Sequence, residues 1–293
     1  MSHARTARSA FGSILPSAPG LTAAIALGVS DVLVKVILAA GCGELTMLSF
    51  RSVVGLAFVA TWLGVGPRPR ADARARWISL GLGVLFAALI FFLFKAIELN
   101  DVATAVLTYF VYPLLTGIAA SVTGIERLRW QGAVCAIAAF FGLAVMIGAH
   151  PAGLVVSGIV FALAAACCRT GVLLVTRAFL TAADARLTTW YSSMSTAAVF
   201  VALSLAAQSW NPPQSVSGWI ALTAMTLATT AGILFIFMST VRIGPFRTAL
   251  IMNVEPLTAT VLGALALGEL ITPVQAVGAA IMLAALAAFQ VLR

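Results

Sequence analysis

The sequence predicts an all-α membrane protein in which ten transmembrane helices form two inverted five-helix repeats around a central cavity. Composition, an internal repeat and the distribution of basic residues lead to this prediction. Hydrophobic residues make up 62% of the 293 residues and charged residues only 9%, whereas a soluble domain carries about 25% charged residues. The apolar runs recur along the whole chain, so many membrane crossings are expected rather than one anchor.

Each apolar run is close to the 20 residues that cross about 30 Å of hydrocarbon. Short connections separate the runs, and no extramembrane domain is expected. Residues 1–19 contain Arg5 and Arg8 but no signal-peptide pattern, which indicates a cytoplasmic tail. The expected spans are 20–39, 45–63, 77–99, 102–122, 131–147, 153–176, 188–207, 218–241, 246–267 and 272–292.

The two halves of the chain repeat each other. Residues 91–107 (FFLFKAIELNDVATAVL) align without a gap with residues 235–251 (FIFMSTVRIGPFRTALI). Each copy continues into an apolar run with a central proline and, at the same spacing, a later glutamate: Pro113 and Glu126, then Pro256 and Glu269. Because five spans per repeat is an odd number, the second repeat (153–292) must lie inverted relative to the first (20–147), as in many secondary transporters.

The net charge of +8 follows the membrane topology and does not indicate a nucleic-acid partner. With ten spans and a cytoplasmic N-terminus, every basic residue outside the spans lies on the cytoplasmic side. The opposite loops contain only the acidic residues Glu44, Asp101 and Glu269. By the positive-inside rule, both termini are expected in the cytoplasm of a bacterial inner membrane or an equivalent one.

Four segments carry a resemblance to a known family: YPLLTGIAASVTGIERL (112–128) with GAVCAIAAFFGLAVM (132–146), and EPLTATVLGALALGELI (255–271) with VGAAIMLAALAAF (277–289). A helix with a central proline and a terminal Gly-Glu pair, followed by a glycine-bearing helix, is similar to each repeat of the drug/metabolite transporter superfamily in its ten-helix EamA-type branch. The resemblance covers nearly the whole chain. It implies two five-helix repeats and a secondary transporter.

Within that superfamily the chain looks most like bacterial amino-acid exporters, including those for aromatic amino acids. One departure concerns the first span, where LGVSDVLVK (27–35) has Ser and Asp in place of the aromatic residue common in the family. Sugar, nucleotide-sugar and drug carriers share the same scaffold, so the fold does not fix the cargo.

Ionisable residues inside the spans are candidate functional groups, because each costs several kcal/mol when it faces lipid. They are Asp31, Lys35, Arg51, Lys95, Glu98, Arg169 and Glu255. Lys95 and Glu98 near a span end can be explained by snorkelling and an i,i+3 pair. Asp31 and Lys35 share one helix face, as a structural pair or as part of a binding site or gate. The last span of each repeat has no such residue and is expected to be peripheral and lipid-facing.

The two prolines indicate a polar site at mid-membrane. Pro256 cannot donate to the carbonyl of Met252, nor Pro113 to that of Tyr109, and Glu255 and Asn253 lie close by. Paired helix breaks are typical of transporter binding sites, although simple kinks would also explain them. Tyr109 and Tyr112 could cover an aromatic ring or an ammonium group, or simply pack.

These residues favour a transporter of a small organic molecule, with an amino acid as the expected substrate and membrane lipid as the surrounding partner. A multidrug, cation or sugar carrier is the alternative on the same fold. An intramembrane enzyme is disfavoured, because no span holds a His and no acidic pair has catalytic spacing. No cluster has metal-ligand spacing and no P-loop is present, so neither a metal nor a cofactor is expected.

Overall fold

A computed structural model describes residues 15–64, 72–148 and 155–291. Of the described residues, 85% are helical and none belongs to a strand. The predicted tail is outside the described residues up to residue 14, and its last residues already belong to the first helices. The elements are η1 Leu15–Ser17, α2 Ala18–Ala39, α3 Glu44–Gly64, α4 Ala73–Leu99, α5 Val102–Tyr109, α6 Tyr112–Val122, α7 Trp130–Ile147, α8 Val156–Phe179, α9 Ala185–Ala206, α10 Val216–Ile243, α11 Pro245–Ile251, α12 Val254–Leu267 and α13 Pro273–Val291.

The all-helical fold confirms the predicted fold class, and eight of the expected spans are single helices. Within the described residues, nine segments are long and apolar enough to cross a membrane, counting α5–α6 and α11–α12 as one segment each. The remaining expected span is α9, which has 22 residues but is less apolar because Ser and Thr are frequent in it. It packs between α3 and α4.

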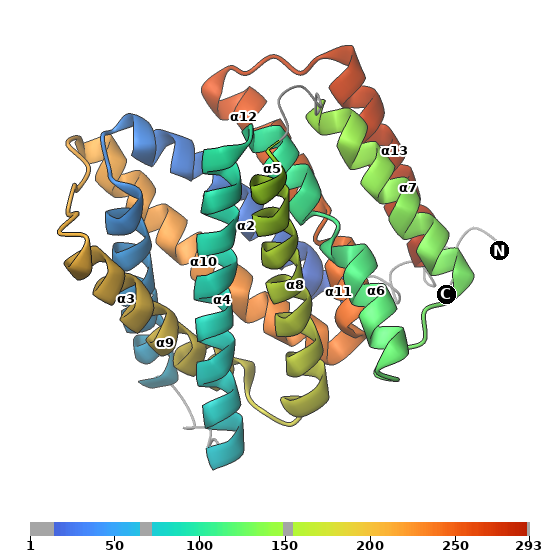
Figure 1. Ribbon diagram of the computed structural model, residues 1–293, viewed down its shortest axis with the longest axis horizontal. Helices are drawn as coiled ribbons and strands as arrows, with labels where there is room; N and C mark the ends of the chain where they lie inside the picture. Colours follow the sequence, from blue (N-terminus) through green and yellow to red (C-terminus); the bar gives the residue numbers. More distant parts are fainter. Residues whose placement is uncertain (1–14, 65–71, 149–154, 292–293) are drawn as a thin grey trace, which may run out of the picture.

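The fourth and ninth spans are each broken near the middle. Residues 110–111 separate α5 from α6, and residues 252–253 separate α11 from α12. Each proline then falls in the first turn of the second piece, where a missing N–H costs no intrahelical hydrogen bond. Figure 1 shows that the chain descends from α5 to α6 and rises from α11 to α12, so the two broken spans run in opposite directions.

Helix contacts repeat between the two halves of the molecule. Helix α2 packs on α10 as α8 packs on α4, and α12 lies against α2 as α6 lies against α8. In each of these two comparisons, the contact in one half of the molecule is formed by the helices that correspond to those in the other half. Two further contacts, α3 with α9 and α7 with α13, join equivalent helices of the two repeats.

The last helix of each repeat lies at one edge of the molecule, beside its counterpart (Figure 1). A Cβ atom on Gly142 of α7 would be 2.6 Å from the backbone N of Met282, and one on Gly278 of α13 would be 2.3 Å from that of Met146. The two backbones therefore touch. The outer faces expose large apolar side chains, including Phe141 and Val277, as expected for peripheral, lipid-facing helices.

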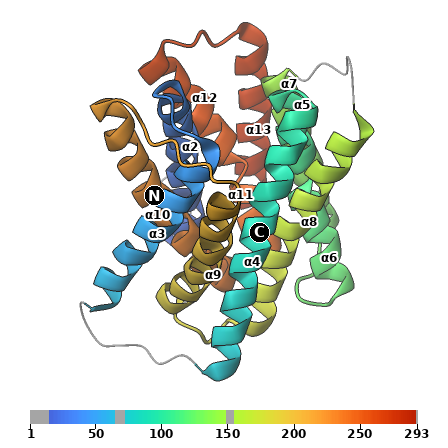
Figure 2. The ribbon, with the colours of Figure 1, turned by 60° about the vertical axis from the view of Figure 1, so that its left-hand side comes forward.

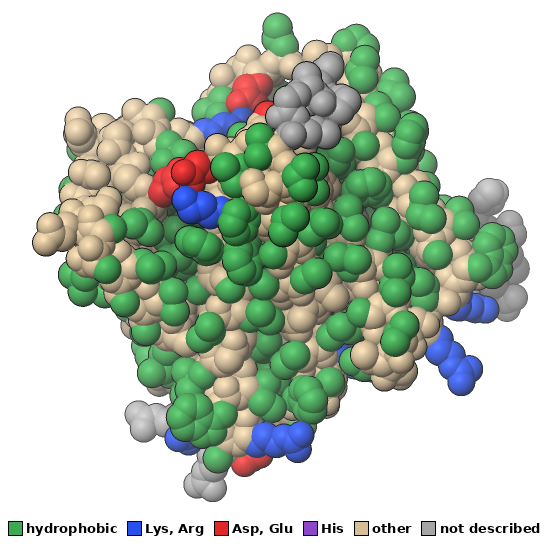
Figure 3. All heavy atoms as spheres, in the orientation of Figure 1, with side chains coloured by type: hydrophobic (Ala, Val, Ile, Leu, Met, Phe, Trp, Pro, Cys, Tyr) green, Lys and Arg blue, Asp and Glu red, His purple; other side chains and the backbone are tan. Residues whose placement is uncertain are grey.

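The molecule has two chemically different ends. Figure 2 shows α4 reaching one end with its N-terminus, while α12 and α13 are joined at the other. In Figure 3 the sides between the ends are mostly green, and blue and red side chains gather towards the ends. The end with the loops around Glu44, Asp101 and Glu269 is called the acidic end below, and the end with Arg127, Arg177, Arg186 and Arg242 the basic end.

Candidate functional site

Four charged residues meet in the middle of the helix bundle, two from each repeat: Asp31 of α2, Arg51 of α3, Arg169 of α8 and Glu255 of α12. Asp31 interacts electrostatically with both Glu255 and Arg51. Glu255 in turn interacts with Arg169. These interactions link Arg51, Asp31, Glu255 and Arg169 in that order.

None of these four charges is in an ion pair with another, because the described residues form ion pairs within 4.0 Å only elsewhere. Asp31 has a large solvent-accessible surface, yet many protein atoms lie around its carboxylate. Both observations hold if Asp31 lines an internal space that solvent can reach. The four charges therefore interact through space without neutralising one another by direct contact.

Arg169 and two tyrosines close one side of this centre. Arg169 is only 4% exposed, and its Cζ atom lies 5.6 Å from the ring centroid of Tyr112. Tyr109 and Tyr112 have ring centroids 5.2 Å apart. Among the described residues, Tyr112 Oη and Arg169 Nε are the two buried side-chain polar atoms without a partner in good hydrogen-bond geometry, although the two side chains interact with each other. Unpartnered buried polar atoms are costly, and a ligand is one explanation for them.

The sequence-based prediction about freed carbonyls is wrong for Met252. The backbone N–H of Glu255 donates to the Met252 carbonyl at 3.0 Å, because the chain turns at the break and brings that N–H into reach. Asn253 is 2% exposed, and its Nδ2 donates to the carbonyl of Leu250 at 2.9 Å. Asn253 thus holds the break together from inside.

Close helix contact fixes the position of Glu255. A Cβ atom on Gly28 of α2 would be 2.7 Å from the carbonyl O of Glu255 and 2.6 Å from Cβ of Thr258. Glycine therefore lets α2 lie directly on the first turn of α12. Gly28 has no local signal in the sequence, since its importance depends on a helix crossing that no local pattern shows.

The two lysines lie away from the centre. Lys35 Nζ is 2.6 Å from Glu269 Oε1, just beyond the end of α12. Of the two alternatives for Lys35 and Asp31, the structural pair between them is therefore not formed, and a role in binding or gating stays a prediction. Lys95 Nζ is 2.6 Å from Glu98 Oε2, which is the i,i+3 pair expected from the sequence. All four side chains are substantially exposed.

A hydroxyl-rich cavity adjoins the centre on the side of Arg51. Its volume is about 30 Å³, which is little more than room for a water molecule. Its lining comes from α3, α4, α9 and α10, including Arg51, Ser52, Ser192, Ser193, Thr196 and Thr230. Ser52, Ser192 and Thr230 donate to backbone carbonyls of their own helices. Their oxygen lone pairs remain to accept hydrogen bonds. These hydroxyls come mainly from the seventh and eighth expected spans, which are rich in Ser and Thr.

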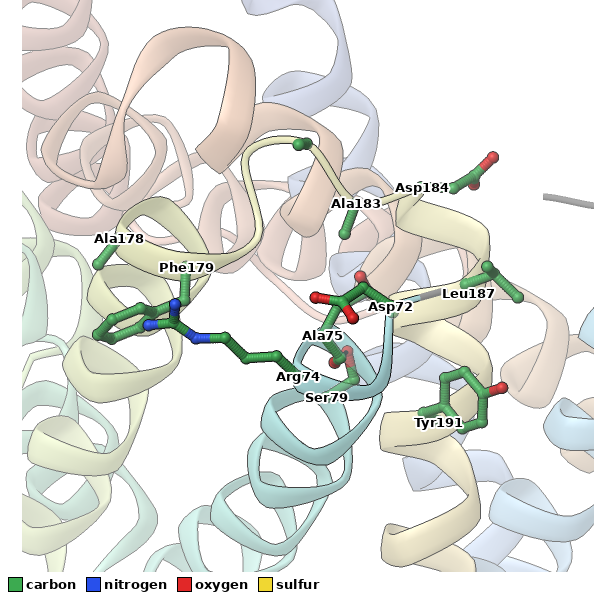
Figure 4. A pocket seen from close by; sticks show the side chains of 12 residues that line it. Asp72, Arg74, Ala75, Ser79, Ala178, Phe179, Ala183, Asp184, Leu187 and Tyr191 are labelled. Atoms are coloured by element: carbon green, nitrogen blue, oxygen red, sulfur yellow. Dashed lines mark hydrogen bonds between the residues drawn. The ribbon is translucent and has the colours of Figure 1, made fainter. Parts of the chain in front are cut away.

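Two further cavities open at the basic end. The first, shown in Figure 4, lies between the start of α4, the end of α8 and the start of α9, and Asp72, Asp184 and Tyr191 line it. There the guanidinium of Arg74 stacks over the Phe179 ring, with Cζ 5.5 Å from the centroid. The second is lined by Trp62, Phe237 and Arg242 among others, and it shares Thr188 with the first.

The fold and this unpaired polar centre define a helical protein that spans the membrane several times. The chain matches the EamA-like transporter family over residues 18–148 and again over residues 156–289. It therefore belongs to the EamA-like transporter family, whose members are membrane transporters.

A solved structure described as "Crystal structure of protein" is similar to this chain, with a TM-score of 0.80 and 20% sequence identity over 94% of this chain and 96% of that chain. At that identity the likeness supports the fold alone. No curated protein matches the chain.

Proposed function

We propose that the protein exports small organic metabolites, namely amino acids including aromatic ones, across a bacterial inner membrane. Transport would proceed by alternating access of two helix bundles about the central site. The charge distribution supports an orientation with the basic end and both termini in the cytoplasm.

The observation that carries this proposal is the set of four central charges without ion-pair partners. Two acids and two cations cancel in net charge, so the site suits a ligand that is itself neutral overall but carries both signs. A zwitterionic amino acid meets this requirement. A permanent cage of four desolvated charges without a ligand would be expensive.

Each part of an amino acid has a counterpart in the site. The ammonium group fits the carboxylates of Glu255 and Asp31. The carboxylate fits Arg51 or Arg169, since Lys35 is already engaged with Glu269 and Lys95 with Glu98. An apolar or aromatic side chain fits against Tyr109 and Tyr112, whose rings can stack on it.

The test is uptake of labelled compounds into proteoliposomes, with a panel of amino acids, sugars and cationic drugs. Glu255→Gln removes a charge and keeps the size of the side chain. Loss of one charge-assisted hydrogen bond costs about 1.5–3 kcal/mol, so amino-acid transport should fall about tenfold or more. Glu98→Gln is the matched control. Glu98 is paired with Lys95 away from the centre, so this variant should transport amino acids at the wild-type rate.

The variant Arg51→Gln distinguishes the proposed amino-acid transport from the alternative, transport of a cationic drug. An amino acid would lose a carboxylate contact and its transport would fall, whereas transport of a cationic drug would be unchanged or rise. If Glu255→Gln transports amino acids at the wild-type rate with unchanged pH dependence, Glu255 is structural and the site is wrongly assigned. Transport of sugars alone would reject the substrate class.

A further inference from the structure

A basic pocket lies at the basic end, separate from the central site. It is formed where α6 leads into α7, and the first residues of α11 and the last turns of α13 complete it. Its lining comprises Glu126, Arg127, Arg129, Gln131, Gly132, Phe246, Arg247 and Phe289. The transport proposal uses none of these residues.

Two arginines of the pocket have no partner. Arg127 and Arg129 are exposed, and neither forms an ion pair or side-chain hydrogen bond with the residues that the structure describes. Arg129 has an extended backbone, with φ −78° and ψ 147°. In an extended segment, residues two apart point to the same side, and Leu128 between them packs against the buried core.

The start of α7 adds backbone donors to the same pocket. The first backbone bond of this helix runs from Ala133 N to the Arg129 carbonyl at 3.1 Å. No side chain caps the helix start. The N–H groups of Trp130, Gln131 and Gly132 are therefore left without intrahelical acceptors, and the N-terminus of a helix favours an anion.

The one acid of the pocket is already engaged. Glu126 Oε2 accepts from the Phe246 backbone N–H at 3.1 Å, and Glu126 Oε1 lies 3.8 Å from Arg247 Nε. Three arginines and one glutamate line the pocket, so its net charge is 3 − 1 = +2. The free cationic groups are those of Arg127 and Arg129, at the rim.

The apolar surroundings indicate a lipid rather than a soluble anion. The floor is formed by Phe246 and Phe289, whose rings meet edge to face at 5.7 Å. The pocket opens beside the lipid-facing pair α7 and α13, and Trp130 next to it is 73% exposed, as expected at a membrane interface. Basic pockets between transmembrane helices commonly hold anionic headgroups.

We infer that this pocket binds the anionic headgroup of a membrane phospholipid, with Arg127, Arg129 and the N-terminus of α7 around the phosphate. The acyl chains would run along the exposed faces of α7 and α13. Bound there, the lipid would bridge the last helices of both repeats at the basic end.

The test is native mass spectrometry of the full chain, with phosphatidylglycerol and phosphatidylcholine added in turn. Wild type should retain one phosphatidylglycerol in preference to phosphatidylcholine. A basic residue near the membrane surface is worth about fivefold in affinity, so Arg127→Gln with Arg129→Gln should weaken retention about thirtyfold. The control is Arg74→Gln with Arg76→Gln, which removes two basic charges at the same end but outside the pocket; their guanidinium groups stack on Phe179 and Tyr191.

Retention lost in the Arg127 and Arg129 variant and kept in the Arg74 and Arg76 variant supports the site. Equal loss in both variants would show only diffuse attraction to a basic surface and would overturn it. Displacement of phosphatidylglycerol by inorganic phosphate at similar concentration would identify a free-phosphate site instead. Lipid retention is measured without transport, so failure here leaves the transport proposal untouched.

Discussion

The two glutamates that end the broken spans behave differently at the two ends of the molecule. At the basic end, Glu126 reaches into the second repeat and accepts a hydrogen bond from the Phe246 backbone at the start of α11. At the acidic end, Glu269 folds back on α12, where its Oε2 would be 2.6 Å from a Cβ atom on Gly263, and it forms an ion pair with Lys35 of α2. The sequence spacing that relates the two residues is identical, but their contacts are not.

The counterpart of the Glu126 contact would join Glu269 to the start of α5. That helix start is capped instead by Asp101, whose Oδ1 accepts from Thr104 N at 2.8 Å. The broken spans are thus tied together at the basic end, and the equivalent tie is absent among the described residues of the acidic end. The proposed alternating access would need such a difference between the ends, because one end closes while the other is open.

Backbone geometry at the basic end should give the largest effect. Gly244 precedes α11 with φ +94° and ψ 163°, a region that is essentially restricted to glycine, and an added Cβ would lie 2.6 Å from Glu126 Oε2. Gly244→Ala should therefore destabilise the protein by about 3 kcal/mol, the upper end for such strain. Thermal unfolding in detergent measures it.

The control for Gly244 is Gly124→Ala. Gly124 has φ +69° with open space around its Cβ position, so only the left-handed backbone is strained, at about 1 kcal/mol. Equal destabilisation by the two variants would mean that the close approach of Glu126 to Gly244 contributes nothing to the tie.

Removal of the Glu126 carboxylate should widen the basic end, where two cavities already lie. Thr188 is 2% exposed beneath both cavities at this end, so a cysteine there in a cysteine-free background reports opening by its labelling rate. A hydrogen bond to a charged group is worth about 1.5–3 kcal/mol, and Glu126→Gln should raise the rate about tenfold. Glu269→Gln should leave it unchanged; a similar rise in both variants would contradict the difference between the ends.

Acid pH should weaken the same tie to a smaller extent. Burial raises the pKa of Glu126, and the Phe246 N–H and the Arg247 charge only partly oppose it. Glu126 therefore takes up a proton at a higher pH than an exposed glutamate does, and the protonated group is a poorer acceptor. Labelling at position 188 should rise as the pH falls through this raised pKa, relative to Glu126→Gln measured at the same pH.

The acidic end should not follow this pH dependence. The hydrogen bonds from Thr104 lower the pKa of Asp101, so its helix cap persists to more acidic pH than the contact of Glu126. A cysteine reporter beside Asp101, at the exposed Val102, should label at a pH-independent relative rate. Opposite behaviour of the two reporters would reverse the comparison.

The sequence by itself determined the spans, the repeat and the broken helices. Hydropathy and the positions of Pro113 and Pro256 are local properties of the sequence. Because unpaired backbone polar groups are costly in lipid, each long apolar run is expected to form a helix, which pairs these groups within one segment. The separation of basic from acidic loops could be read in the same way, because it depends only on the number of spans.

Only the tertiary structure decided which charges meet. Lys35 and Glu269 are 234 positions apart, and Asp31 faces Glu255 and Arg51 although its helical neighbour Lys35 is the nearer charge along the chain. The contact of Glu126 with Phe246 likewise joins the two repeats. Such pairings depend on how closely α2, α12 and the other helices approach, which glycines such as Gly28 set across the bundle; the periodicity of one helix contains no information about the helix that it packs against.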